Sequence, residues 1–260
     1  MDVSEVLTVF DEQMRRNPAP EPDTSVERDA RITRVVGPPG SWRGVTWSDL
    51  RDSDVGAVID DQIARLTPYG DWEWKLYSYD EPTDLSDRLV AFGFIREADE
   101  TVLVAALDEL DLVASPPPGV EIVPVVDGHG VDAVVAVHDE VFGGTHDDIR
   151  RALLAGLEAQ PADVAAVLAV ADGVPVSAGR VELPEDRDFA SIWGGGTLPA
   201  WRGRGVFRSL VAHRAALAAA RGYRYLQVDA SSDSRPILQR LGFTELATTT
   251  PHQCSAGTVR

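Results

Sequence analysis

The stretch that decides the fold is GGGTLPAWRGRGVFRSLVAHRAALAAARG, which runs from Gly194 to Gly222. It leads from an apolar strand, through a turn that contains a proline, into an amphipathic helix expected over 205–222. A strand-to-helix junction of this kind presents unpaired backbone N–H groups at the positive end of the helix dipole. The stretch therefore predicts a place where an anion can bind.

Glycine and arginine alternate immediately before this expected helix. Gly203 and Gly205 let a bulky anion approach the backbone, and Arg202 and Arg204 add positive charge. A solvated turn is the alternative explanation for such a string. The Lys and Ser/Thr that end a nucleoside-triphosphate loop are absent, and no acidic residue is placed for a nicotinamide ribose. These two types of phosphate-binding site are therefore excluded, and the loop is predicted to bind the pyrophosphate of a different ligand.

Three consecutive glycines, Gly194 to Gly196, lie in the strand before the loop. Glycine weakens ordinary strand pairing and often marks a bulge or the close approach of another backbone. We expect a ligand with an amide-bearing arm to pair with the strand edge that opens there.

Strands and helices alternate on both sides of the junction. The strands are expected at 120–126, 164–171, 174–183, 189–198 and 223–230, and the helices at 131–142, 147–160, 205–222 and 234–243. Asp172-Gly173 is a strong signal for a tight hairpin. The order predicts a mixed α/β (α+β) fold with an antiparallel front and one strand–helix–strand crossover.

The chain divides at ASPPPG, residues 114–119, because three prolines favour a stiff extended linker. Residues 1–24 are expected to form an N-terminal helix and linker, followed by a first domain over 25–113 and a second over 120–260. Both domains contain the succession strand, turn, short helix and Gly-Phe, which ends at Gly93-Phe94 and at Gly242-Phe243. This echo predicts a duplicated architecture.

Composition narrows the class of protein. The 260 residues are 44% hydrophobic, enough for a buried core, and no apolar run approaches the ~18 residues of a membrane span. A net charge of −18 excludes nucleic acid and anionic membranes as expected partners. The acidic first residues predict no secretory signal, and the lone Cys254 allows no internal disulfide, so a cytoplasmic location is expected.

Residues 120–250 resemble the GNAT superfamily of N-acyltransferases. The family's loop reads Gln/Arg-x-x-Gly-x-Gly/Ala, and Arg202 to Phe207 occupy these six places. Phe207 departs from the pattern, because Gly or Ala is usual there. The first domain resembles a degenerate repeat of the same fold, which implies a tandem arrangement.

The resemblance implies that acetyl-CoA is the co-substrate. It assigns the pyrophosphate to the loop and first helical turn, the pantetheine arm to the glycine strand, and further cofactor contacts to serines after the last strand. These residues are Gly203, Arg204, Gly205, Val206, Phe207 and Arg208; Gly195, Gly196 and Thr197; and Ser231, Ser232 and Ser234.

The two usual proton-transfer groups of the family are missing, since Leu238 stands in the place of a Tyr and Gln227 in the place of a Glu. Glu182 and Asp229 are the candidate catalytic replacements. The alternatives are a solvated edge carboxylate for Glu182 and a helix cap for Asp229. Transfer by positioning alone, with water relaying the proton, is a further alternative.

The acceptor is expected to be an amine of a small molecule or a peptide. Its candidate binding residues are His138, Asp139, Glu140 and Trp193, with a polar helix face and simple packing as the alternative roles. No metal is expected, and the first domain is expected to shape the acceptor cleft or a homodimer. The rival function is a non-catalytic sensor that binds acyl-CoA or a protein partner.

Overall fold

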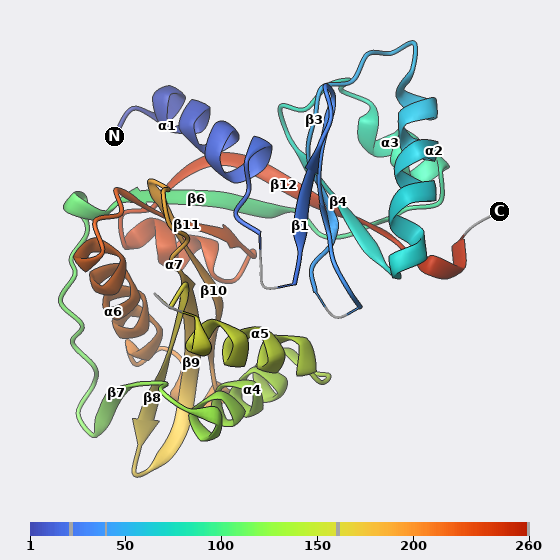
Figure 1. The fold of residues 1–260 in the computed structure, drawn as a ribbon. Coiled ribbons are helices and arrows are strands. Elements are labelled where there is room, and N and C mark those ends of the chain that lie inside the picture. The colour runs from blue at the N-terminus through green and yellow to red at the C-terminus, as the bar shows by residue number, and fades with distance from the viewer. Residues whose placement is uncertain (21–22, 40, 160–161, 259–260) are drawn as a thin grey trace. The chain divides into compact units, whose positions relative to one another are not determined.

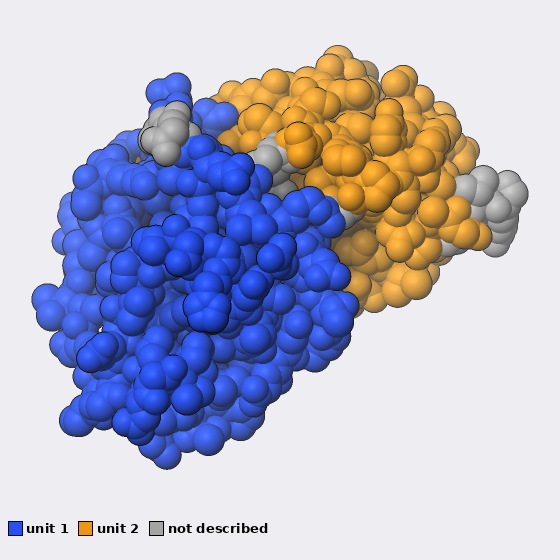
Figure 2. Space-filling model, turned by 60° about the horizontal axis from the view of Figure 1, so that its bottom comes forward, with its two compact units in different colours: residues 1, 103–229, 233–245 blue, residues 2–102, 230–232, 246–260 orange. Residues whose placement is uncertain are grey.

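A computed structural model describes residues 1–20, 23–39, 41–159 and 162–258 (Figure 1). The chain forms two compact units, coloured separately in Figure 2. Unit 1 comprises Met1, Leu103–Asp229 and Asp233–Glu245, and unit 2 comprises Asp2–Val102, Ala230–Ser232 and Leu246–Arg260.

Unit 1 is built on a mixed sheet with the strand order β6-β11-β10-β9-β8-β7. The strands are β6 (Glu100–Ala106, of which the first residues belong to unit 2), β7 (Val120–Pro124), β8 (Val164–Ala171), β9 (Val174–Glu182), β10 (Phe189–Thr197) and β11 (Tyr225–Ala230). Strands β7 to β10 pair antiparallel, whereas β10 and β11 pair in parallel. Asp172 and Gly173 have φ of 50° and 78°, as a tight β8–β9 hairpin requires.

Helices cover both faces of this sheet. They are α4 (Gly128–Phe142), α5 (Asp147–Glu158), α6 (Val206–Ala220) and α7 (Arg235–Arg240), with short turns η3 (Leu107–Glu109) and η4 (Pro199–Trp201). In β8, Ala166 and Leu168 pack in the core under α4 and α5, whereas Val167 and Ala169 pack in the core under α6. The strand is buried on both faces, which explains its continuous apolar sequence.

Unit 2 holds a sheet with the order β1-β2-β3-β4-β12. Its elements are α1 (Val3–Phe10), the π-helical turn η1 (Asp11–Arg16), β1 (Ser25–Arg28), β2 (Ile32–Val36), β3 (Gly44–Ser48), α2 (Val55–Leu66), η2 (Thr67–Tyr69), β4 (Trp72–Tyr77), α3 (Leu85–Ala91), β5 (Ile95–Arg96), β12 (Thr244–Cys254) and η5 (Ala256–Thr258). Its core contains Trp72 and Trp74 of β4, both buried. Strand β5 pairs with β12.

The division into units does not coincide with the predicted linker at 114–119. Residues 246–260 belong to unit 2, because Thr249–Cys254 of β12 pair antiparallel with Tyr77–Trp72 of β4. Residues 103–113 belong to unit 1. The chain therefore leaves unit 2 before the prolines and returns to it at the end.

The short helix followed by Gly-Phe, which occurs in both halves, also has the same backbone hydrogen bonds in each. After α3, Phe94 N–H donates to Leu89 C=O (3.1 Å) and Gly93 N–H to Val90 C=O (2.9 Å). After α7, Phe243 N–H donates to Leu238 C=O (3.2 Å) and Gly242 N–H to Gln239 C=O (3.1 Å). Gly93 and Gly242 have φ of 96° and 103°, so both helices end in the same Schellman motif.

The described part of the chain contains no helix that is both long and apolar enough to cross a membrane.

Candidate functional site

Strands β10 and β11 separate at the centre of unit 1. They pair only over Phe189–Ser191 and Tyr225–Gln227, although β10 continues to Thr197 and β11 to Ala230. Beyond Ser191, β10 pairs with β9 in the part of the chain that the structure describes. The pairing of β10 with β11 therefore ends well before either strand does, and the two strands diverge there.

A bulge lies on β10 directly after the divergence begins. Between the pairs Trp193–Arg180 and Gly196–Ala178, β10 advances three residues and β9 two. A Cβ on Gly195 would lie 2.9 Å from Cε2 of Phe207, and a Cβ on Gly196 would lie 3.0 Å from Cγ1 of Val141. The glycine run is thus required by close packing on both faces.

The loop before α6 leaves the start of that helix open. Gly203 and Gly205 have φ of 73° and 88°, and a Cβ at Gly203 would meet nothing within 4 Å. Gly205 is the N-cap, and no side chain caps the helix. Nη2 of Arg208 lies 3.5 Å from where a Cβ of Gly205 would be. Free N–H groups and a guanidinium therefore converge, as an anion site needs.

Two arginines hold the loop in place. Nε of Arg202 donates to the carbonyl of Thr197 at 3.0 Å, and the guanidinium of Arg204 lies 4.8 Å from the ring centre of Trp201. The turn is therefore fixed to the end of β10.

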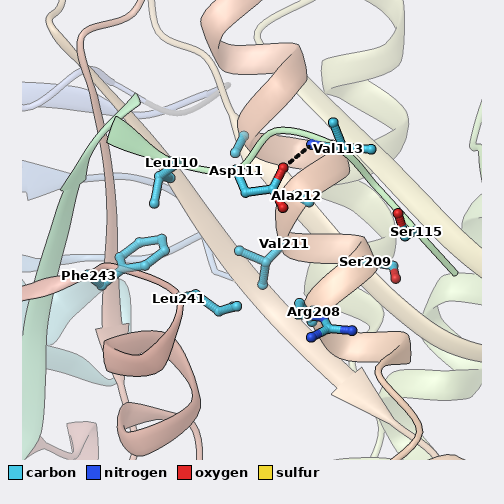
Figure 3. A pocket seen from close by; sticks show the side chains of 11 residues that line it. Leu110, Asp111, Val113, Ser115, Arg208, Ser209, Val211, Ala212, Leu241 and Phe243 are labelled. Atoms are coloured by element: carbon cyan, nitrogen blue, oxygen red, sulfur yellow. Dashed lines mark hydrogen bonds between the residues drawn. The ribbon is translucent and has the colours of Figure 1, made fainter. Parts of the chain in front are cut away.

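A cavity of about 240 Å³ follows one side of α6, beginning at Arg208 (Figure 3). Its walls include Val211, Ala212, Leu241 and Phe243, and its other side is formed by the segment from Leu110 to Ser115. Sequence reasoning missed this cavity, because that segment is distant in the chain and carries no motif.

Glu182 and Trp193 meet on neighbouring strands. Nε1 of Trp193 donates to Oε2 of Glu182 at 3.0 Å, and Nε of Arg180 donates to Oε1 at 3.4 Å. Burial raises the pKa of the Glu182 carboxyl, against the opposing effects of Arg180 and Trp193. Its side chain still has 37% exposure, so a ligand can reach it.

Gln227 and Asp229 continue the same polar face on β11. Nε2 of Gln227, which is buried, donates to Oγ of Ser191 at 3.0 Å. Ser191 is the register partner of both Gln227 and Glu182, so these side chains lie on one face of the sheet. Asp229 lies two residues further along on that face and is half-buried.

The end of α4 approaches the bulge on this face. Cδ2 of His138 lies 3.4 Å from where a Cβ of Gly194 would be. Burial, together with His146 and Arg180, lowers the pKa of His138 to about 4, against Asp139 and Asp148. His138 is therefore neutral at pH 7.

Asp139 and His146 lie beside His138. Nδ1 of His146 and Oδ1 of Asp139 are 2.7 Å apart, and the ring centres of His138 and His146 are 4.2 Å apart. Glu140, which the sequence places with these residues, is exposed on the helix and is not part of the cluster. His146 was missed, because it follows a glycine turn and has no neighbours of its own type in the sequence.

Comparison with known families identifies this arrangement. The model of the acetyltransferase (GNAT) family matches residues 131–243, which include the bulge, the divergent strands, the loop and α6. Residues 131–243 are a GNAT acetyltransferase domain. The predicted family resemblance and mixed α/β fold are confirmed.

Solved structures share the fold along most of the chain. A GCN5-related N-acetyltransferase from Kribbella flavida has 18% identity and a TM-score of 0.69, covering 96% of this chain and 95% of that one. One from Sphaerobacter thermophilus has 17% identity and a TM-score of 0.60, with coverages of 88% and 82%. A tandem GNAT protein from the clavulanic acid biosynthesis pathway has 16% identity and a TM-score of 0.59, with coverages of 93% and 86%.

No curated protein matches the sequence significantly. The match to the GNAT family supports the fold and a general class of chemistry, acyl-CoA-dependent acetyl transfer. It does not identify the acceptor.

The predicted serines are divided between the units. Ser234 is the N-cap residue of α7 in unit 1, whereas Ser231 and Ser232 are exposed and belong to unit 2. Their contacts with a cofactor stay predictions, as do those of the loop residues.

Arg214 is a feature of the GNAT domain that the sequence did not reveal. It is buried in α6, and its Nη1 donates to the carbonyls of Arg180 (3.1 Å) and Trp193 (3.4 Å). Burial and the charge of Arg180 lower its pKa. Its guanidinium thus supports both strands at the edge of the bulge.

Proposed function

We propose that the GNAT domain binds acetyl-CoA and transfers the acetyl group directly to an amine within a ternary complex. The observation that carries this proposal is the uncapped start of α6 facing a loop of two left-handed glycines, beside the divergence of β10 and β11. An anion and an extended amide-bearing arm have separate, adjacent binding groups there.

The loop residues fit the two parts of the co-substrate. The backbone amides from Gly203 to Arg208 would hold the pyrophosphate, because no side chain caps them and Arg208 adds a positive charge. Gly195 to Thr197 would pair with the pantetheine arm along the edge that β11 leaves. The cavity that starts at Arg208 would receive another part of CoA.

The reaction joins the acceptor nitrogen to the acetyl carbon and breaks the bond from that carbon to sulfur. A neutral amine attacks the carbonyl carbon. The nitrogen then loses one proton and the leaving thiolate gains one, so the reaction is balanced. Backbone N–H groups at the bulge would polarise the thioester carbonyl. Glu182 would accept the proton from an acceptor ammonium, because its raised pKa brings it closer to neutral pH, with Asp229 as the alternative base.

The acceptor would enter on the face that carries Glu182, Trp193 and His138. A neutral His138 does not repel a cationic amine, and Asp139 beside it supplies negative charge. This favours an amine-bearing small molecule or peptide, which agrees with the net charge of −18.

A sensor that binds acyl-CoA without turnover is the second candidate. Leu238 is buried in α7 and Gln227 is buried beside Ser191, so the places of the family's acid and base hold groups that cannot transfer a proton. The two candidates agree on binding and differ in the fate of the thioester.

A thiol-release assay decides between them. The protein is incubated with acetyl-CoA and a panel of polyamines, aminoglycosides, amino acids and peptide N-termini, and free CoA is measured. The enzyme is expected to release CoA at a rate that depends on one amine class and saturates with its concentration. Acetyl-CoA that binds and stays intact with every amine would favour the sensor.

A further inference from the structure

The end of α4 and the start of α5 bring together three side chains with metal-binding chemistry, two of which, His138 and Asp139, also lie on the proposed acceptor face. His138 and Asp139 lie in the last turns of α4, and His146 directly precedes α5. Each offers one ligand atom, and these three atoms all lie within 4.8 Å of one another. A short segment with left-handed Gly143 and Gly144 brings His146 back onto α4.

The hydrogen bonding and exposure of these groups suit metal ligands. Nδ1 of His138 is buried and has no hydrogen-bond partner among the described residues. Nδ1 of His146 shares its hydrogen bond with Oδ1 of Asp139, and an ion binding there would replace the shared proton. The side chains of His146 and Asp139 are 25% and 32% exposed, so an ion can enter from solvent.

We propose that His138, Asp139 and His146 bind one divalent transition-metal ion at the acceptor side of the GNAT domain. Two imidazoles and one carboxylate favour zinc and its neighbours over magnesium or calcium, which prefer oxygen ligands. Three protein ligands leave a coordination position open for water or for a donor atom of a ligand.

The charged residues around His138, Asp139 and His146 are compatible with a bound cation. Asp148, near the start of α5, adds a second carboxylate to the electrostatic surroundings of His138. Arg180 opposes a cation, but its guanidinium is paired with Glu182 at 3.4 Å. The lack of partners at metal spacing around His252 and Cys254 favours no metal there, whereas the turn after α4 brings His146 to His138 at a different place.

The experiment is a metal titration of the full-length, untagged protein after treatment with a chelator. Cobalt(II) is added while the visible d–d absorption is followed, and zinc is titrated by calorimetry. We expect one ion per chain with micromolar affinity. His138→Ala and His146→Ala should each weaken binding at least tenfold.

The matched control is His129→Ala, on the exposed first turn of the same helix, which should bind as the wild type does. Circular dichroism of each variant shows whether it is folded, and Asp139→Asn, which preserves size, provides a milder test of the third ligand. No binding by folded wild type at millimolar zinc would overturn the proposal. Equal loss of affinity in the His129 variant would overturn it too.

Discussion

At the scale of single residues, the surroundings of Glu182 and Asp229 distinguish the two candidate bases. Glu182 is fixed by Trp193 and Arg180 and is still reachable, and burial raises its pKa. Asp229 lies at the divergence of the strands on the same face. The face therefore offers one carboxylate on each strand beside β10.

We predict that Glu182→Gln removes the acidic limb of the pH–rate profile. The base must be ionised to accept a proton, and a raised pKa means that activity is lost as pH falls through a value above the ~4.3 of an ordinary Glu. Single-turnover rates measured across pH with an accepted amine test this. Asp229→Asn is the control and should retain the limb. An unchanged limb in Glu182→Gln would assign the proton to Asp229 or to water.

At the scale of elements, α5 can pack close to β8 because Gly156 has no side chain. A Cβ on Gly156 would overlap Cγ1 of Val164 and lie 3.1 Å from its Cβ. Val164 is β-branched and buried at the start of β8, so its side chain has little freedom to move. The glycine thus sets how closely this helix approaches the sheet, and with it the place of His146 at the start of α5.

We predict that Gly156→Ala lowers the free energy of unfolding by about 1–3 kcal/mol, because overpacking outweighs the helix propensity of ~1 kcal/mol gained by Ala. Urea unfolding measures the difference. Gly128→Ala in the first turn of α4 is the control, since its Cβ would lie 3.8 Å from Leu154, an ordinary contact, and stability should not fall. A Gly156 variant as stable as the wild type would show that the helix can shift outward.

At the scale of the whole molecule, local sequence signals predicted most helices and strands. They did not predict which strands pair when these lie far apart in the chain. Strand β8 begins and ends where its apolar run does, whereas α7 ends at Arg240 and not at the predicted 243, because Gly242 has a φ of 103°. Helix α4 starts three residues earlier than predicted, because Oδ1 of Asp127 accepts a hydrogen bond from Gly130 N–H.

The division into units could not be predicted from the proline run, because it depends on the pairing of β12 with β4, more than 170 residues apart in the chain. The same limit applies to the site. The glycine–arginine loop is contiguous in the sequence, so it could be proposed as a site from the sequence alone. The cavity beside α6 and the approach of His146 to His138 join residues that are distant in the chain, so they could not. Arg214 was hidden for another reason, since an arginine in an apolar helix gives no sign that it will be buried.

The most direct test of the central claim is calorimetric titration of acetyl-CoA into wild type, Gly205→Asp and Gly222→Asp. Gly205 and Gly222 flank the two ends of α6 with φ of 88° and 86°, so both variants introduce the same charge and similar backbone strain. We predict binding to wild type and to Gly222→Asp, and affinity reduced more than tenfold (~1.4 kcal/mol) in Gly205→Asp, where a carboxylate faces the phosphates. Absence of binding to wild type, or equal affinity in the Gly205 variant, would contradict the assignment of the loop as the pyrophosphate cradle.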